Sequence, residues 1–340
     1  MALSEGRSVE LSQELLKGAI DIHVHPGPHL FSSPRRVDPF QAAIQARDAG
    51  MRAIVLLDCF GMSNGTAWLV NRQVPDFKTF GGLILNTVYG GMNPRAFKTA
   101  IYYGDGAKYL NFGTHSTHYQ ASKEGRMVDG RFVPLSELYP KFREEELSRC
   151  IRIPVDEPPG PALDEILQLL VSHSHIYMDT GHVSLEEAER LVDLKEEYGY
   201  EKIVVSSAVT KIATLDQLKT MADKSAFIEF SFAAYTAPTL IPLTHYYVEK
   251  EYISIDEGMT EDPAGGIKLV ARQMRELGAE HCIMSTDFGR YALSPPVEGL
   301  RQFIACMLDL GIPPKDIRTM VKTNPERLLG LEPQDSPQNR

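Results

Sequence analysis

Two histidines that stand two residues apart are the residues of this 340-residue chain best suited to chemistry. His23 and His25 end a short alternating apolar run, and a loop that contains proline and glycine follows them. Successive side chains of a strand point to opposite faces, so we expect both imidazoles on the same side of the strand. Two imidazoles at the end of a strand can share one metal ion. The pattern therefore predicts a metal site at this point of the chain.

Two further residues are candidates to complete the metal site. His182, in Thr-Gly-His-Val-Ser, follows a predicted strand, and Asp287, in Met-Ser-Thr-Asp, ends the last predicted strand. Three imidazoles and one carboxylate suit zinc, manganese or iron, and one zinc ion is the cofactor we expect. A bound divalent ion lowers the pKa of a water, so Asp287 could bind the ion, accept the proton of the water, or do both.

The order of predicted elements indicates how distant residues can meet. Apolar strands, most of them followed by a helix, recur about every 30 residues, which is typical of a (β/α)8 TIM barrel. An open doubly wound sheet is the competing arrangement, but the chain has neither GxGxxG after the first strand nor a P-loop. In a closed barrel the first and last strands are neighbours, which would bring Asp287 to the histidine pair. We expect one barrel domain over residues 1–331, with insertions near 113–160 and 233–262, and a disordered tail over 332–340.

Other polar residues follow predicted strands at the face where barrel active sites lie. Glu229 is a carboxylate inside an apolar strand, and it must face a pocket or meet a basic partner because an unpaired buried charge is costly. We predict a catalytic role for Glu229. Either His115 or His118 could serve as a further metal ligand or acid–base group, and His118 is the predicted one. The predicted substrate-binding residues are His115, Arg290, Asp58 and Ser207. Arg35 and Arg36 are further candidates to hold a substrate carboxylate.

These motifs together resemble the amidohydrolase superfamily over residues 19–331. The resemblance rests on the first-strand His-x-His, on His182 and Asp287, and on the closing Asn-Pro-Glu-Arg-Leu-Leu-Gly of residues 324–330. Residues 21–28, 180–184 and 294–301 more closely resemble a poorly characterised amidohydrolase-like branch. The resemblance implies a metal-dependent hydrolase that uses a metal-activated water on an amide, lactone or cyclic amide of a small molecule.

The chain departs from the superfamily pattern in two places. The sixth strand ends in Ser206 and Ser207, where most members have a histidine. Lys108 lies at the start of the fourth strand, away from the end at which many members carry a metal-bridging lysine. One metal ion is therefore expected rather than two. The alternatives are a lyase-type member (decarboxylase or hydratase), a phosphoesterase of the histidinol-phosphatase type, and a degenerate barrel without catalytic activity.

Composition restricts the class of partner. The net charge of −10 includes no basic cluster, which argues against nucleic acid, and no apolar stretch is long enough to span a membrane. The four cysteines form no CxxC pair, so a reducing, cytoplasmic location is expected. We expect a small-molecule substrate. A homo-oligomer is compatible with the sequence, and the aromatic stretch 230–247 is the candidate for an interface or a lid.

Overall fold

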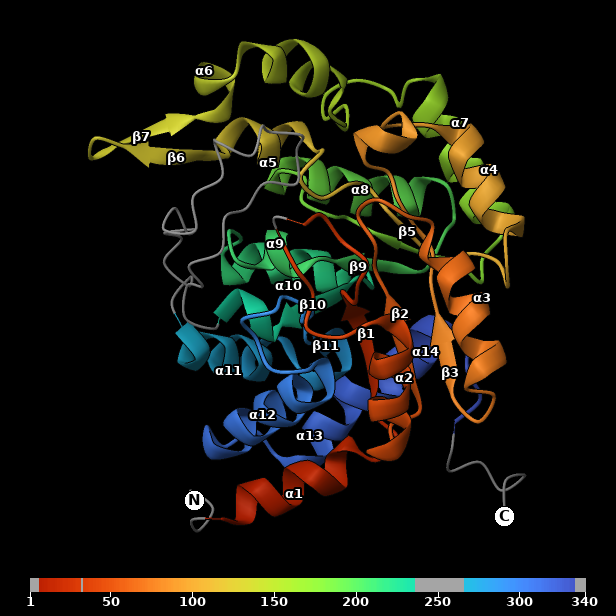
Figure 1. The fold of residues 1–340 in the computed structure, drawn as a ribbon, viewed down its shortest axis with the longest axis vertical. Helices are drawn as coiled ribbons and strands as arrows, with labels where there is room; N and C mark the ends of the chain where they lie inside the picture. Colours follow the sequence, from red (N-terminus) through yellow and green to blue (C-terminus); the bar gives the residue numbers. More distant parts are fainter. Residues whose placement is uncertain (1–5, 32, 236–265, 334–340) are drawn as a thin grey trace.

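The computed structural model describes residues 6–31, 33–235 and 266–333, and its parallel strands form a closed barrel (Figure 1). Two hydrogen-bonded sheets contribute, one with the strand order β1-β2-β3 and the other with β11-β10-β9-β8-β5-β4. The chain itself joins β3 to β4, which together occupy one strand position. The barrel strands are β1 (Ile20–Val24), β2 (Ala53–Leu56), β3 (Lys78–Phe80), β4 (Leu83–Ile84), β5 (Tyr109–Asn111), β8 (Tyr177–Asp179), β9 (Ile203–Val205), β10 (Phe227–Ser231) and β11 (Cys282–Ser285). The predicted (β/α)8 fold is therefore confirmed.

The barrel closes between β1 and the exit of β11. Val24 forms a parallel bridge with Phe288. The His25 amide donates to the Phe288 carbonyl at 2.9 Å, and the Asp287 amide donates to the His23 carbonyl at 2.8 Å. These bonds satisfy the backbone of both strands beyond their last regular residues, so the segments after β1 and β11 stay in register at the carboxyl end of the barrel.

Helices surround the barrel, and their starts follow ordinary capping chemistry. Ser184 caps α8, and its hydroxyl and the Glu187 side chain form the expected capping box. The helices after the strands, with α1 before the barrel, are α1 (Arg7–Leu16), α2 (Pro39–Asp48), α3 (Ser63–Gln73), α4 (Pro94–Tyr102), α7 (Pro161–Ser172), α8 (Leu185–Glu197), α9 (Ser207–Thr210), α10 (Leu215–Asp223), α11 (Gly266–Leu277), α12 (Pro296–Asp309), α13 (Pro314–Arg318) and α14 (Asn324–Leu329). Within the described ranges, none of the helices has both the length and the apolar character that a membrane span requires.

The barrel interior is divided into an apolar part and a polar part. Alternate strand residues such as Ile20, Val55, Tyr109 and Ile283 belong to one buried cluster inside the ring of strands. Most of the polar side chains described below come from the carboxyl halves of the strands or the loops after them. In barrel enzymes the interior is likewise packed with apolar side chains, and the polar residues of the active site lie at the carboxyl ends of the strands.

The structure adds two features that the sequence pattern did not indicate. The helix α1 precedes the first strand and contacts α12 (Figure 1). The insertion near 113–160 contains α5 (His118–Lys123), the antiparallel hairpin of β6 (Gly125–Val128) and β7 (Arg131–Pro134), and α6 (Leu135–Leu138). Short strands and one-turn helices carry too little periodicity to be recognised in a charged segment.

Most of the second insertion lies outside the described residues, which stop at Tyr235 and resume at Gly266. The predicted interface or lid over 230–247 also falls largely there, as does most of the predicted tail over 332–340. These expectations, and the assignment of residues 1–331 to one domain, stay predictions.

Candidate metal centre

The two histidines converge because β1 contains an irregularity. Ile20 and Asp21 pair with consecutive residues of β2, but the register shifts before Val24. Such a bulge changes the direction of the side chains beside it. The Nε2 atoms of His23 and His25 lie 3.1 Å apart, with the two rings tilted by 58°. The expectation that both imidazoles face the same side is met, although not by simple strand alternation.

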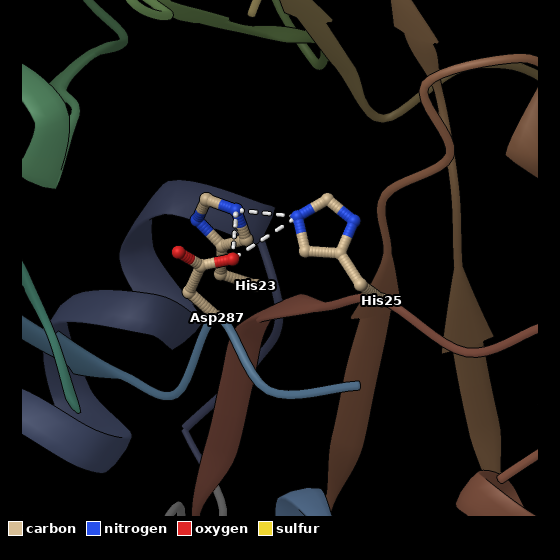
Figure 2. A group of neighbouring side chains, drawn as sticks. All are labelled: His23, His25 and Asp287. Carbon is tan, nitrogen blue, oxygen red and sulfur yellow. Dashed lines mark hydrogen bonds and ion pairs between the residues drawn. The ribbon is translucent and has the colours of Figure 1, made fainter. Parts of the chain in front are cut away.

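Asp287 joins the histidine pair from the other side of the barrel seam. Its carboxylate oxygen Oδ1 lies 3.2 Å from His25 Nε2 and 3.5 Å from His23 Nε2 (Figure 2). Ligand atoms of these three residues, here called the His–His–Asp cluster, all lie within 4.8 Å of one another. Asp287 also has a φ of 55°, a left-handed conformation that is uncommon for a residue other than glycine. Backbone strain of this kind is often retained at functional sites.

The outer nitrogens of both histidines have partners that orient the rings. Nδ1 of His23 lies 2.9 Å from Oε1 of Glu229, and Nδ1 of His25 lies 2.9 Å from the carbonyl of Leu57. A carbonyl only accepts hydrogen bonds, so Nδ1 of His25 carries the proton and the lone pair of its neutral ring is on Nε2. Ligating histidines in proteins are commonly held in this way, through a carboxylate or a carbonyl behind the ring. Both Nε2 atoms are thus directed into the cluster.

The electrostatics of the cluster favour a positive charge. Burial alone lowers the pKa of His23, but the negative charges of Glu229 and Asp287 outweigh it and raise this pKa to about 10. Burial lowers the pKa of His25, so this ring is neutral near pH 7. For Asp287, burial is outweighed by the charge of His23 and the hydrogen bond from His25, which hold its pKa well below the usual range. Two imidazole nitrogens that face each other beside an ionised carboxylate therefore suit a divalent cation.

Glu229 lies behind His23 and outside the cluster. One oxygen contacts His23 and accepts from the Ser285 hydroxyl at 2.7 Å, and the other accepts from the Ser207 amide at 3.1 Å. The side chain is 1% exposed. Of the two expectations for Glu229, the structure shows the basic partner. These contacts suit a residue that positions His23, and the catalytic role of Glu229 stays a prediction. Ser207, predicted to bind substrate, is likewise buried and engaged with Glu229 and Ser231.

Two buried carboxyl groups near the cluster were missed. Asp21 accepts from the Thr286 hydroxyl at 2.5 Å and from the amides of His23 and Thr286 at 3.1 Å, so it ties β1 to the residue before Asp287. Burial raises its pKa to about 7. Asp179 ends β8, and burial together with the charge of Glu229 raises its pKa to about 7. The signal that singled out Glu229, a carboxylate within an apolar strand, applies to both.

His115 and His182 lie next to each other. The rings of His115 and His182 have centroids 5.5 Å apart, and His115 also contacts the carboxylate of Glu124. Nδ1 of His182 is buried without a hydrogen-bond partner in the described part of the chain. His182 is not a member of the His–His–Asp cluster as the structure stands. Its predicted role as a fourth ligand stays a prediction.

His118 is placed differently from His115. It is the first residue of α5 and is only partly buried, and the charges that act on it are those of Arg152 and Glu187. The structure therefore brings His115, rather than His118, beside His182. The catalytic role of His118 stays a prediction. The sequence could not separate the two because both lie in one loop of small polar residues.

Arg290 and Asp58, both predicted to bind substrate, lie on segments that continue from barrel strands. Arg290 stands three residues after Asp287 and forms an antiparallel bridge with Arg35. Asp58 follows β2, and its Oδ1 accepts from the Phe60 amide at 2.8 Å. Both side chains are partly exposed, and their substrate-binding roles stay predictions.

Solved structures with a similar fold include two proteins from Pseudomonas aeruginosa. The probable dipeptidase PvdM from Pseudomonas aeruginosa is similar with a TM-score of 0.60 and 12% identity, over 96% of this chain and 98% of the other. An amidohydrolase from the same organism has a TM-score of 0.51 and 11% identity, over 95% of this chain and 98% of the other. The resemblance to the amidohydrolases is thus confirmed at the level of the fold.

Sequence comparison is less informative about activity. No curated protein matches the chain. Residues 18–229, more than half of the chain, match the family of unknown function DUF6282. The matched part includes both histidines of the cluster and Glu229, whereas Asp287 lies beyond it.

Proposed function

The chain belongs to the family of unknown function DUF6282, and we propose that it is a metal-dependent hydrolase that acts on a carbonyl-type bond of a small molecule. The observation that carries this proposal is the convergence of two oriented imidazole nitrogens and a carboxylate at the carboxyl end of a barrel. The structural likeness to a probable dipeptidase and an amidohydrolase supports it at the level of fold.

His23, His25 and Asp287 are the proposed holders of one divalent ion, with zinc first and manganese or iron next. Once His23 has lost its proton on metal binding, their donor set of two imidazole nitrogens and one carboxylate oxygen is typical of zinc and leaves room for a further ligand. His182 is the candidate for that position. When bound, the ion would supply Lewis acidity, polarising a substrate carbonyl and lowering the pKa of a water.

The protein's own residues divide the remaining tasks. Glu229 holds His23 by its Nδ1 atom, and the Leu57 carbonyl holds His25, so neither ring has to reorganise before reaction. Asp287 is ionised, and its carboxylate is proposed to orient the attacking water and accept its proton. The bond that breaks is the carbonyl carbon–nitrogen or carbon–oxygen bond of an amide, lactone or cyclic amide.

A substrate panel in 18O-labelled water tests the reaction class. Hydrolysis places one labelled oxygen in the product carboxylate, whereas the lyase alternative with decarboxylation does not. Asp287→Asn keeps the size of the side chain but cannot accept the proton, so turnover should fall by about 10²-fold or more with the fold intact. Turnover equal to wild type in Asp287→Asn, with metal still bound, would remove Asp287 from the proposed mechanism.

A further inference from the structure

The loop after β1 folds back onto the segment after β11, beside the His–His–Asp cluster. The Arg36 amide donates to the Gly289 carbonyl at 2.7 Å, and the Tyr291 amide donates to the Pro34 carbonyl at 3.0 Å. Arg35 and Arg290 are bridge partners in this antiparallel pairing. Since the His25 amide is bonded to Phe288, the same segment is fixed to β1 as well. The backbone thus holds Arg35 and Arg290 together, next to the histidine and carboxylate of the cluster.

The Arg35 side chain is partly buried, and its Nε atom is fully buried without a hydrogen bond. The charges of Asp287 and Asp58 act on its guanidinium from a distance, but no carboxylate of the described residues forms an ion pair with it. Burial, and then the neighbouring charge of Arg290, lower its pKa. A guanidinium with a buried, unpartnered nitrogen beside a second arginine is unfavourable unless an anion compensates the charge.

The neighbouring Arg36 provides the contrast. Its side chain is exposed, and its guanidinium carbon lies 5.6 Å from the ring centroid of Tyr291. Arg36 therefore has the environment of an ordinary surface arginine, and Arg35 does not. The two residues are adjacent in sequence but point to different surroundings.

The charge of Arg35 reaches the cluster and the loop beside it. Burial, and next the charge of Arg35, lower the pKa of His29 to about 2. The same charge acts on His25, and Asp287 acts on Arg35 in turn. The carboxylate of Asp287 is already engaged with the two imidazoles, so it does not serve as the ion-pair partner of Arg35.

We propose that Arg35, together with Arg290, binds an oxyanion group of the substrate, a carboxylate or a phosphate, beside the bond that the cluster attacks. An arginine guanidinium offers paired N–H donors that match the oxygens of either group. That the bound anion is part of a substrate rests on the proposed function, and the substrate is then an anionic small molecule. The anion site itself can be tested by binding alone, without turnover.

The test is calorimetric titration of the full-length protein, with the metal content of each preparation measured first. The probes are succinate, its neutral analogue succinamide, and inorganic phosphate. Wild type should bind at least one of the two anions and should bind succinamide much more weakly. Tighter binding of succinate indicates a carboxylate-bearing substrate, and tighter binding of phosphate indicates a phosphate-bearing one. Added salt should weaken the binding of the anion, because it screens the charges.

Arg35→Gln and Arg36→Gln form a matched pair of variants. Loss of a charge-assisted bond should raise the anion dissociation constant by about tenfold or more in Arg35→Gln. Arg36→Gln should bind as wild type does. The same anion affinity in Arg35→Gln as in wild type, an equal loss in Arg36→Gln, or no anion binding by wild type overturns the proposal.

Two further variants cover the case in which Arg35→Gln does not fold. Arg35→Lys keeps the charge but loses the paired donors, and Arg290→Gln removes the second arginine; both should weaken anion binding. Wild-type affinity in both variants overturns the proposal. Metal-free protein with Arg35-dependent anion binding would contradict the proposed function and support this site. Metal-loaded protein that binds neither anion would support metal binding as proposed and overturn the anion site.

Discussion

At the scale of single residues, the contact between His23 and Glu229 orients one histidine of the His–His–Asp cluster. The carboxylate holds the ring at Nδ1 and supplies the largest effect that raises the pKa of His23. The Ser285 hydroxyl and the Ser207 amide in turn hold the carboxylate. The orientation of His23 is therefore set by a chain of hydrogen bonds that reaches two neighbouring strands.

Glu229→Gln should weaken metal binding without unfolding the protein. Glutamine keeps the size of the side chain but removes the charge behind His23, and such losses typically cost about 10- to 100-fold in metal affinity. Competition with a chromogenic chelator measures the affinity. Glu187→Gln is the control, because Glu187 is also buried and accepts backbone hydrogen bonds, but at the start of α8. An affinity in Glu229→Gln equal to that of wild type would contradict the positioning role.

Metal binding near neutral pH should release about one proton per ion. In the metal-free protein, His23 has a pKa of about 10 and is protonated, whereas His25 is neutral and Asp287 ionised. The ion must displace the proton of His23, so metal affinity should rise with pH up to about 10. Titration calorimetry in buffers of different ionisation enthalpy counts the protons. Release of none at neutral pH would show that His23 is not a ligand.

The same raised pKa makes a prediction for the metal-free fold. Protonated His23 stabilises this state fully below the unfolded-state pKa of about 6.5. The stabilisation is lost as the pH rises through about 10. Denaturant unfolding of chelator-treated protein should therefore show stability falling between these limits, and a flat profile would contradict the charge balance of the cluster.

At the scale of elements, the close approach of the segments after β1 and β11 positions Asp287. A Cβ on Gly289 would lie 1.7 Å from the His25 carbonyl oxygen, so only glycine permits this contact. The barrel seam and the His–His–Asp cluster thus depend on the same backbone approach. The periodicity of apolar residues in the sequence does not predict this close approach.

Gly289→Ala should therefore damage both stability and metal binding. The backbone must move away from His25, at a cost of about 1–3 kcal/mol in the free energy of unfolding. Metal affinity should fall in parallel. Gly160→Ala is the control, since no atom lies within 4 Å of a Cβ added there. Urea unfolding and chelator competition measure the two effects, and an unchanged metal affinity in Gly289→Ala would contradict the link between seam and site.

The closing helix α14 anchors the opposite end of β11. The side-chain amide nitrogen Nδ2 of Asn324 donates to the carbonyls of Ala279 and Cys282 at 2.8 and 2.7 Å. Asn324→Ala leaves these carbonyls without a donor and should lower the free energy of unfolding by about 1–3 kcal/mol. Metal affinity should stay at the wild-type value, because the contact lies at the start of the strand. Loss of metal binding in this variant would show that the two ends of β11 are not independent.

At the scale of the whole molecule, the sequence predicted the barrel because strands covered on both faces read as apolar runs. The same rule placed His23, His25 and Asp287 at strand ends, where the structure brings them together. It could not predict which loop residues meet across the chain. The pairing of Arg35 with Arg290 and the contact of His115 with His182 depend on the folded path of loops, which side-chain periodicity does not encode.

The metal content of the purified full-length protein tests the central claim most directly. After incubation with zinc and removal of the excess, elemental analysis should find about one equivalent per chain in wild type. His175→Ala, a change of an exposed histidine before β8, should bind the same amount, and His25→Ala should bind far less. Wild-type protein that stays metal-free after incubation with zinc, manganese or iron would contradict the account.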